Sequence, residues 1–154
     1  MILARWTFAL ILGLAAQAGG PSSESDSGLT AAEKEQLQKE QKIDSRIKIY
    51  ETASTRLFKA LEANVLKEDF QSVPACLKTW TSLLDLAVED INANASRKKK
   101  SKALIRYEIQ LRKALADVQG FKIRAPVDEQ DEFDAFLNRA EEIRKKFVDI
   151  LFPG

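Results

Sequence analysis

Apolar side chains recur every three or four positions along most of this 154-residue chain. This spacing is the period of a helix that buries one face. Between Leu29 and Gln119 the sequence has no glycine and a single proline, Pro74, so little in this stretch interrupts a helix. No convincing alternation of apolar and polar residues indicates a strand. The pattern therefore predicts an all-α protein.

The first apolar stripe predicts a long helix over residues 30–67. Thr30 and Glu33 have the spacing of a capping box, in which each side chain satisfies a free backbone N–H. Residues 33–42 are nearly all Glu, Lys and Gln and have little to bury. We therefore expect this helix to bend near residues 44–45, or its first turns to project or fray.

Two further stripes predict the second and third helices. The second begins with Ser72 as its expected N-cap and has Pro74 in the first turn, where the missing N–H costs nothing. A polar and basic connection follows over residues 92–102. The third helix carries its stripe over residues 104–118, and Gly120 is well placed just after its end.

A loop over residues 121–127 separates the third helix from the fourth, which Asp128 is expected to cap and Pro153 to end. Five acids near its start suit the positive end of the helix dipole: Asp128, Glu129, Asp131, Glu132 and Asp134. They do not fit a calcium loop, because Phe133 stands where such a loop needs glycine.

Four amphipathic helices with short connections most simply form an antiparallel four-helix bundle built from two helical hairpins. The expected core combines the stripe of the first helix with Trp80, Leu84, Tyr107, Leu111, Phe133, Leu137 and Phe147.

The start of the chain predicts a cleavable export signal. A short segment with one positive charge, residues 1–5, precedes an apolar run over residues 6–16. This run is shorter than the roughly 20 residues that span a bilayer. Ala16-Gln17-Ala18 then matches an A-x-A cleavage site. The alternatives are an uncleaved anchor and a chance apolar start.

The resulting organisation is a signal peptide (1–18), a disordered leader (19–29) and a helical bundle domain (30–154). We expect no membrane span in the mature chain, and a location in the periplasm or outside the cell.

Charge and composition exclude several function classes. Of the 24 basic residues the signal removes only Arg5, which leaves 23 basic and 23 acidic residues and no net charge to attract nucleic acid or anionic lipid. The absence of histidine excludes Ser-His-Asp and Cys-His catalysis and every His-containing zinc site. No phosphate-binding glycine loop or serine elbow occurs. We therefore predict a non-enzyme without a cofactor, although carboxylates from separate helices could still meet in a cleft.

Cys76 is the only cysteine, so no disulfide can form within the chain. It lies near the start of the second helix, one position from the apolar stripe. We interpret it as a partly buried small residue; the alternative is a disulfide between two chains.

A basic run is the strongest local feature of the sequence. Its candidate contact residues are Arg97, Lys98, Lys99, Lys100, Lys102 and Arg106. The functional interpretation is contact with an anionic surface: phospholipid headgroups, an acidic envelope polymer or an acidic protein partner. The alternative is a solvated loop that joins two helices and prevents aggregation. Export and the lack of interleaved aromatics argue against nucleic acid.

The export signal, the stripe from Ile47 to Leu61 and the helical hairpin after it resemble a broad class of exported bacterial helical proteins. The resemblance covers most of the mature chain and implies no known activity or functional residues.

The combined prediction is a non-catalytic exported protein that binds a macromolecular partner or an envelope surface. An enzyme or small-ligand carrier with a pocket inside the bundle is the alternative. Homo-oligomerisation through the first helix stays open.

Overall fold

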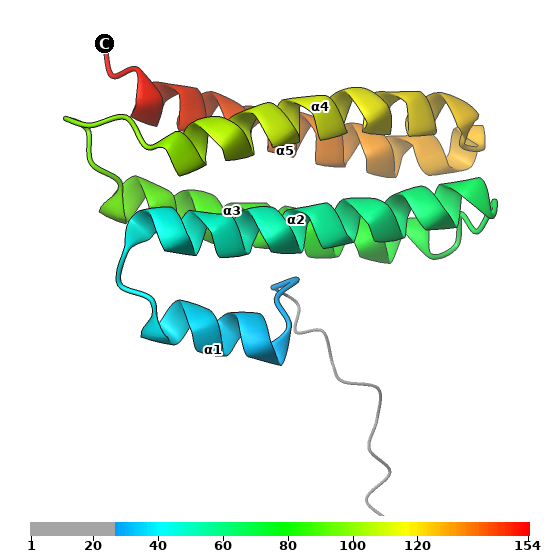
Figure 1. Cartoon of the computed structure of the whole chain (residues 1–154). Coiled ribbons are helices and arrows are strands. Elements are labelled where there is room, and N and C mark those ends of the chain that lie inside the picture. Colours follow the sequence, from blue (N-terminus) through cyan, green and yellow to red (C-terminus); the bar gives the residue numbers. More distant parts are fainter. Residues whose placement is uncertain (1–26) are drawn as a thin grey trace, which may run out of the picture.

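The computed structural model describes residues 27–154 (Figure 1). The predicted signal peptide and leader residues 19–26 lie outside this range. The helices are α1 (Ala31–Lys39), α2 (Ile43–Leu66), α3 (Val73–Asn94), α4 (Lys102–Arg124) and α5 (Gln130–Leu151), and the 3-10 turn η1 (Val127–Glu129) precedes α5. The described residues form helices and no strand, which confirms the all-α prediction.

The four long helices pack in two layers, α2 with α3 and α4 with α5 (Figure 1). Between the layers α2 packs on α4 and α3 packs on α5. Helices joined by a short turn run in opposite directions, whereas the pairs between layers run in the same direction. The connection between α3 and α4 therefore joins diagonally opposite helices, and it lies at one end of the molecule.

Aromatic rings from all four long helices meet inside this arrangement. The ring centroids of Trp80 in α3 and Phe136 in α5 are 4.7 Å apart. Phe58 in α2 lies 6.0 Å from Trp80 and 5.9 Å from Phe121 in α4. The indole N–H of Trp80 donates a 2.8 Å hydrogen bond to Ser54 Oγ, so the buried polar atom has a partner.

The remaining core is aliphatic and aromatic. The predicted core residues Trp80, Leu84, Tyr107, Leu111, Phe133 and Phe147 are all fully buried. Leu137 is only partly buried and packs against the edge of the core.

The first predicted helix is interrupted at residues 40–42, close to the bend expected at residues 44–45. Glu40 and Lys42 are extended, and α1 folds back onto α2 instead of projecting or fraying. Leu37 is 7% exposed, so even this polar stretch buries one side chain. The capping box is confirmed: the N–H of Thr30 donates to Glu33 Oε2 at 2.8 Å, and the N–H of Glu33 donates to Thr30 Oγ1 at 3.1 Å.

The third helix is longer than predicted. Gly120 does not end it, and most of the expected loop over residues 121–127 is helical as far as Arg124. The physical reason is tertiary, because Phe121 on the next turn stacks on Phe58 of α2. The helix ends just before Pro126, whose ring disfavours helical backbone at the preceding residue.

Two predicted caps also differ. Asp128 lies inside η1, and α5 begins after Glu129 without a side-chain cap. Ser72 occupies the N-cap position of α3, but its hydroxyl donates to Asp69 Oδ2 at 2.7 Å instead of accepting from the helix. In both places the helix start is held by packing and not by a local cap.

The chain before α1 is anchored at Gly28, inside the segment expected to be a leader. Gly28 has φ +74, and an added Cβ would lie 3.0 Å from Leu57 Cδ1 and 3.1 Å from the carbonyl oxygen of Thr79. The Gly28 carbonyl accepts a 2.7 Å hydrogen bond from Arg56, and Leu29 is 3% exposed. This segment is therefore part of the packed structure.

We predict that Gly28→Ala lowers the free energy of unfolding by about 1–2 kcal/mol. The positive φ is unfavourable for alanine, and the new methyl group lies too close to the carbonyl oxygen of Thr79. Gly120→Ala is the matched control: its Cβ meets nothing within 4 Å, and its helical backbone should gain up to about 1 kcal/mol. Urea unfolding followed by circular dichroism measures both. Equal stability of the two variants would contradict this packing of residue 28.

Candidate binding surface

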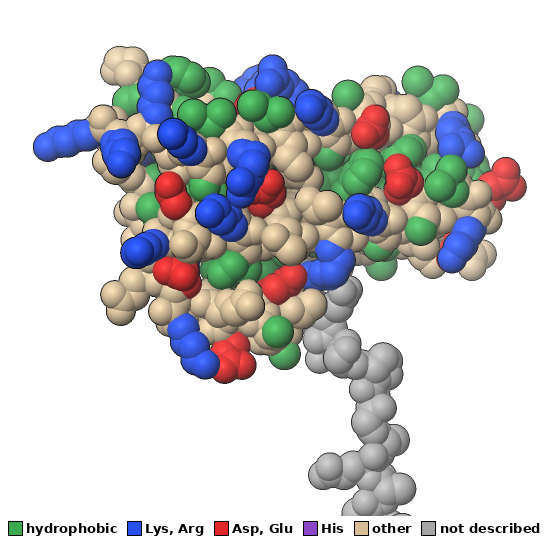
Figure 2. Space-filling view, viewed as in Figure 1, with side chains coloured by type: hydrophobic (Ala, Val, Ile, Leu, Met, Phe, Trp, Pro, Cys, Tyr) green, Lys and Arg blue, Asp and Glu red, His purple; other side chains and the backbone are tan. Residues whose placement is uncertain are grey.

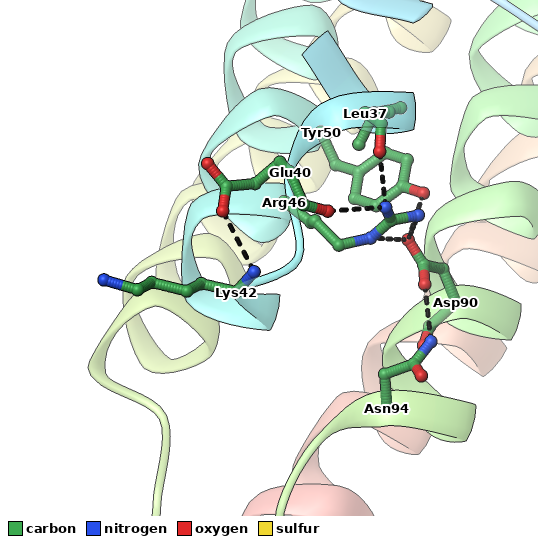
Figure 3. Close-up of polar contacts among 7 residues, drawn as sticks. All are labelled: Leu37, Glu40, Lys42, Arg46, Tyr50, Asp90 and Asn94. Carbon is green, nitrogen blue, oxygen red and sulfur yellow. Dashed lines mark hydrogen bonds and ion pairs between the residues drawn. The ribbon is translucent and has the colours of Figure 1, made fainter.

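A polar cluster fastens α1 to the bundle (Figure 3). The Arg46 guanidinium donates from Nε and Nη2 to Asp90 Oδ2, at 2.8 and 2.7 Å. Its Nη1 donates to the carbonyl oxygens of Leu37 and Glu40, at 2.5 and 3.1 Å. These carbonyls lie at the end of α1, where no helical N–H can reach them. Arg46 thus joins α1, α2 and α3 at one point.

Tyr50 and Asn94 complete this cluster. The Tyr50 hydroxyl donates to Asp90 Oδ2, and Asn94 Nδ2 donates to Asp90 Oδ1 at 2.8 Å. Burial alone would raise the pKa of Asp90, but the hydrogen bonds from Tyr50 and Arg46 outweigh it and hold that pKa below its usual value. Because its members bind one another, we interpret the cluster as a structural clamp and not as a catalytic site.

The basic run lies in the connection between α3 and α4 and at the start of α4. Ser96 orders the turn, because its Oγ accepts from the N–H groups of Lys98 and Lys99 at 3.2 and 3.4 Å. Ser101 caps α4 by accepting from the N–H of Leu104 at 3.1 Å, and its hydroxyl donates to Asp44 Oδ1 at 2.7 Å. The backbone of the connection is therefore tied down at both ends, while its long side chains face outward.

We call Arg97, Lys98, Lys99, Lys100 and Lys102 the basic end. All five side chains are exposed. Within residues 27–154, no carboxylate oxygen lies within 4.0 Å of any of the four lysine amines. Figure 2 shows Lys and Arg side chains gathered at the end of the molecule that carries this connection. The positive charge of the basic end is thus open to solvent.

The sixth predicted contact residue is placed differently. Arg106 lies one turn into α4 and pairs with Glu51 of α2, with Nε 3.0 Å from Oε2. Arg97 donates to the side-chain oxygen of Asn92 at 2.7 Å. Because this partner is uncharged, the positive charge of Arg97 is not neutralised. The structure therefore brings five of the six predicted cations together and neutralises Arg106.

An aromatic ring that the sequence pattern did not indicate lies within the basic end. The amine of Lys100 is 4.1 Å from the centroid of the Phe152 ring, which is a cation–π contact. The ring is 57% exposed. Phe152 directly follows Leu151, the last residue of the α5 stripe. The only sequence signal of its exposure is that it falls outside the three- and four-residue spacing of that stripe.

A groove of about 600 Å³ between α3 and α5 reaches the basic end at Arg97. Its charged lining residues are Asp85, Glu89, Arg97, Arg139, Lys146 and Asp149. Arg139 pairs with Asp85 and Glu142 at 2.7 and 2.9 Å, and hydrogen bonds to Glu142 and Asp85 raise its pKa. Because three acids and three bases line it, the groove offers no field of one sign to a ligand.

Cys76 is half-buried in α3, as the sequence indicated. Asn64 Nδ2 donates to its Sγ at 3.2 Å, which gives the sulfur a weak polar contact inside the α2–α3 hairpin.

Among residues 27–154, no three or more His, Cys, Asp or Glu side chains are grouped so as to hold a metal ion. None of the helices in this part of the chain combines the length and apolarity needed to cross a bilayer.

Comparison of the chain with protein-family models, with curated proteins and with solved structures finds no match.

We predict that Arg46→Ala lowers the free energy of unfolding by about 2 kcal/mol, because it leaves Asp90 without its charged partner and two helix-end carbonyls without the Arg46 donor. It should also speed proteolysis in the link between α1 and α2. Arg112→Ala is the control, since the Arg112 side chain is 61% exposed, lies 3.7 Å from Glu108 and leaves that carboxylate paired with Arg144; stability should change by less than about 0.5 kcal/mol. Equal protease resistance of the Arg46 variant and the wild type would refute the clamp.

A second prediction concerns the tyrosines. The chain has two, Tyr50 and Tyr107, at 1% and 0% exposed. Burial, with the bond to Asp90 in the case of Tyr50, raises the pKa of both above the usual value of about 10. Protonated phenols therefore favour the folded state, so their contribution to stability is complete below about pH 10 and declines as the pH rises above it.

Near-ultraviolet absorbance should thus show no phenolate in the folded protein at about pH 10, and then both tyrosines ionising as the chain unfolds in alkali. In concentrated urea both should titrate near about pH 10. One phenolate appearing early in the folded protein would mean that a tyrosine is open to water.

Proposed function

We propose that this chain is exported, loses residues 1–18, and acts as a non-catalytic helical bundle of two antiparallel hairpins that binds an anionic surface. The contact is made by the basic end. The location is the periplasm or the outside of the cell, and nucleic acid is not the partner there. The proposal rests on one observation, the set of exposed lysine amines at one end of the molecule that have no carboxylate neighbour among residues 27–154.

The distribution of charge supports this role. From Ile91 to Tyr107 the sequence has six cations and no acid. The mature chain as a whole is neutral, so at distances beyond the Debye length of about 10 Å its charges largely cancel. At contact, only the nearest cations act, and each Lys or Arg near an anionic surface contributes roughly 1 kcal/mol. A neutral protein with one basic end is therefore oriented by the surface that it binds.

The geometry gives little support to an internal ligand pocket. The centre of the bundle is filled by large side chains below 2% exposed: Tyr50, Trp80, Tyr107, Phe133 and Phe147. The linings of the hollows between α3 and α5, of about 380 and 600 Å³, include exposed charged side chains such as Lys78, Glu132 and Glu89. A carrier would need an enclosed apolar cavity with a few converging polar groups.

We predict that replacing Lys98, Lys99 and Lys100 with Gln weakens binding to anionic vesicles about a hundredfold at low salt. The estimate follows from roughly 1 kcal/mol for each cation and about 1.4 kcal/mol for each tenfold change. Co-sedimentation with vesicles of phosphatidylglycerol and phosphatidylcholine measures it, and retention on immobilised dextran sulfate should fall in parallel.

The matched control replaces Lys59, Lys67 and Lys113 with Gln. These lysines are also exposed and lie outside the basic end. Their replacement lowers the net charge by the same amount as the first triple substitution. The control should bind nearly as the wild type does. If both triple variants lose affinity equally, net charge and not the basic end is responsible; if the wild type binds neither probe, the proposal fails.

A further inference from the structure

Phe152 is an aromatic side chain held outside the core. The apolar stripe of α5 ends at Ile150 and Leu151, which are each 4% exposed. At Phe152 the backbone leaves the helix, with φ −132 and ψ 66, while its N–H still donates to the carbonyl oxygen of Val148 at 2.8 Å. The backbone is thus tied to the last turn of α5, and the ring points to solvent beside Lys100.

The position of this ring sets it apart from other exposed apolar side chains. The large exposed hydrophobic residues between 27 and 154 are Leu66, Leu86, Ile123, Val127 and Phe152. Leu66 and Ile123 lie near the far ends of α2 and α4, away from the basic end. Phe152 is the aromatic member of this set, and it is the one that contacts a cation of the basic end.

We propose that the anionic surface is a phospholipid bilayer, and that Phe152 enters its interfacial layer while the lysines contact the headgroups. This inference rests on the proposed function and names its partner. A soluble acidic polymer provides partners for the amines but none for a phenyl ring. A bilayer provides both, because the charged headgroups lie directly above an apolar layer that accepts aromatic and aliphatic side chains.

The contact between Lys100 and Phe152 fits this orientation. Its geometry, with the amine 4.1 Å from the ring centroid, keeps a charge and an apolar group at one point of the surface. When the ring moves below the headgroups, the flexible lysine chain extends outward and its amine stays in the polar layer. The five cations and the ring then contact the membrane together, and the bundle stands on its basic end.

The test uses a chain that starts at Gly19, which retains every described residue and lacks the apolar run over residues 6–16 that would itself bind lipid. Any affinity tag is placed at the N-terminus, because Phe152 lies only two positions before Gly154. Phe152→Ala should weaken binding to phosphatidylglycerol vesicles about tenfold, through the lost apolar transfer, and change retention on dextran sulfate by less than about twofold.

Ile123→Ala is the matched control, since it removes a side chain that is 74% exposed at the opposite end of the bundle. It should leave vesicle binding unchanged. The unfolding midpoints of both variants should equal that of the wild type, because neither side chain lies in the core.

Phe152→Trp provides a direct measurement of insertion. The chain from Gly19 has one tryptophan, Trp80, which is 0% exposed and lies in the core. Brominated lipids in the vesicles should quench the fluorescence of the Phe152→Trp variant and leave the wild-type emission unchanged.

The outcomes separate this inference from the function on which it rests. If the triple lysine variant loses binding to both probes, but Phe152→Ala binds vesicles as the wild type does and bromolipids do not quench Phe152→Trp, the surface is an acidic polymer. The lipid inference is then overturned and the proposed function stands. Vesicle-specific loss in Phe152→Ala, together with quenching, establishes the bilayer contact. Failure of the wild type to bind either probe overturns both.

Discussion

Trp80 and the three phenylalanine rings around it join all four long helices, and the rest of the molecule is arranged about that contact. Phe58, Phe121 and Phe136 come from α2, α4 and α5. The rings lie in the order Phe136, Trp80, Phe58, Phe121, and the centroids of neighbouring rings are 4.7 to 6.0 Å apart. Such pairs contribute about 0.5–1.5 kcal/mol each beyond the area they bury. These ring contacts fix how the α2–α3 hairpin is aligned along the α4–α5 hairpin. The two ends of the bundle then differ in what they contain.

At the end farther from this aromatic contact, polar links are added to the apolar packing of residues such as Ile47, Leu104 and Phe147. There Arg46 binds Asp90 and the carbonyls that end α1, and Ser101 links the start of α4 to Asp44 in α2. The connection from α3 to α4 crosses the bundle diagonally at this end, and its residues 96–100 are exposed. A diagonal crossing of this kind favours residues that are stable in water, and a row of lysines meets that requirement. The same feature that closes the fold therefore places positive charge at the surface.

Much of the fold follows from local patterns. The stripes of α2 to α5 and the Thr30–Glu33 capping box depend on residues within one or two turns of each other, and each is present in the structure. Gly120 shows where a local rule is overridden: glycine favours a helix end, yet Phe121 finds a partner on α2 and the helix continues. The basic run was visible in the sequence. The sequence did not show that Arg106 is paired while the other five cations are open to solvent. Its partner Glu51 lies 55 positions earlier in the chain, so no local pattern links the two residues.

By itself, the sequence determined that this protein is helical, where its helices lie to within a turn or so, and that a cluster of cations separates α3 from α4. These properties depend on spacings of three and four residues and on local backbone preferences, which act before any helix meets another. Only the tertiary structure decided that α1 folds back, through an arginine and an aspartate 44 positions apart, and that Lys100 lies against Phe152. Contacts of that kind depend on which helix becomes whose neighbour, and the packing of large side chains in the common core settles that choice.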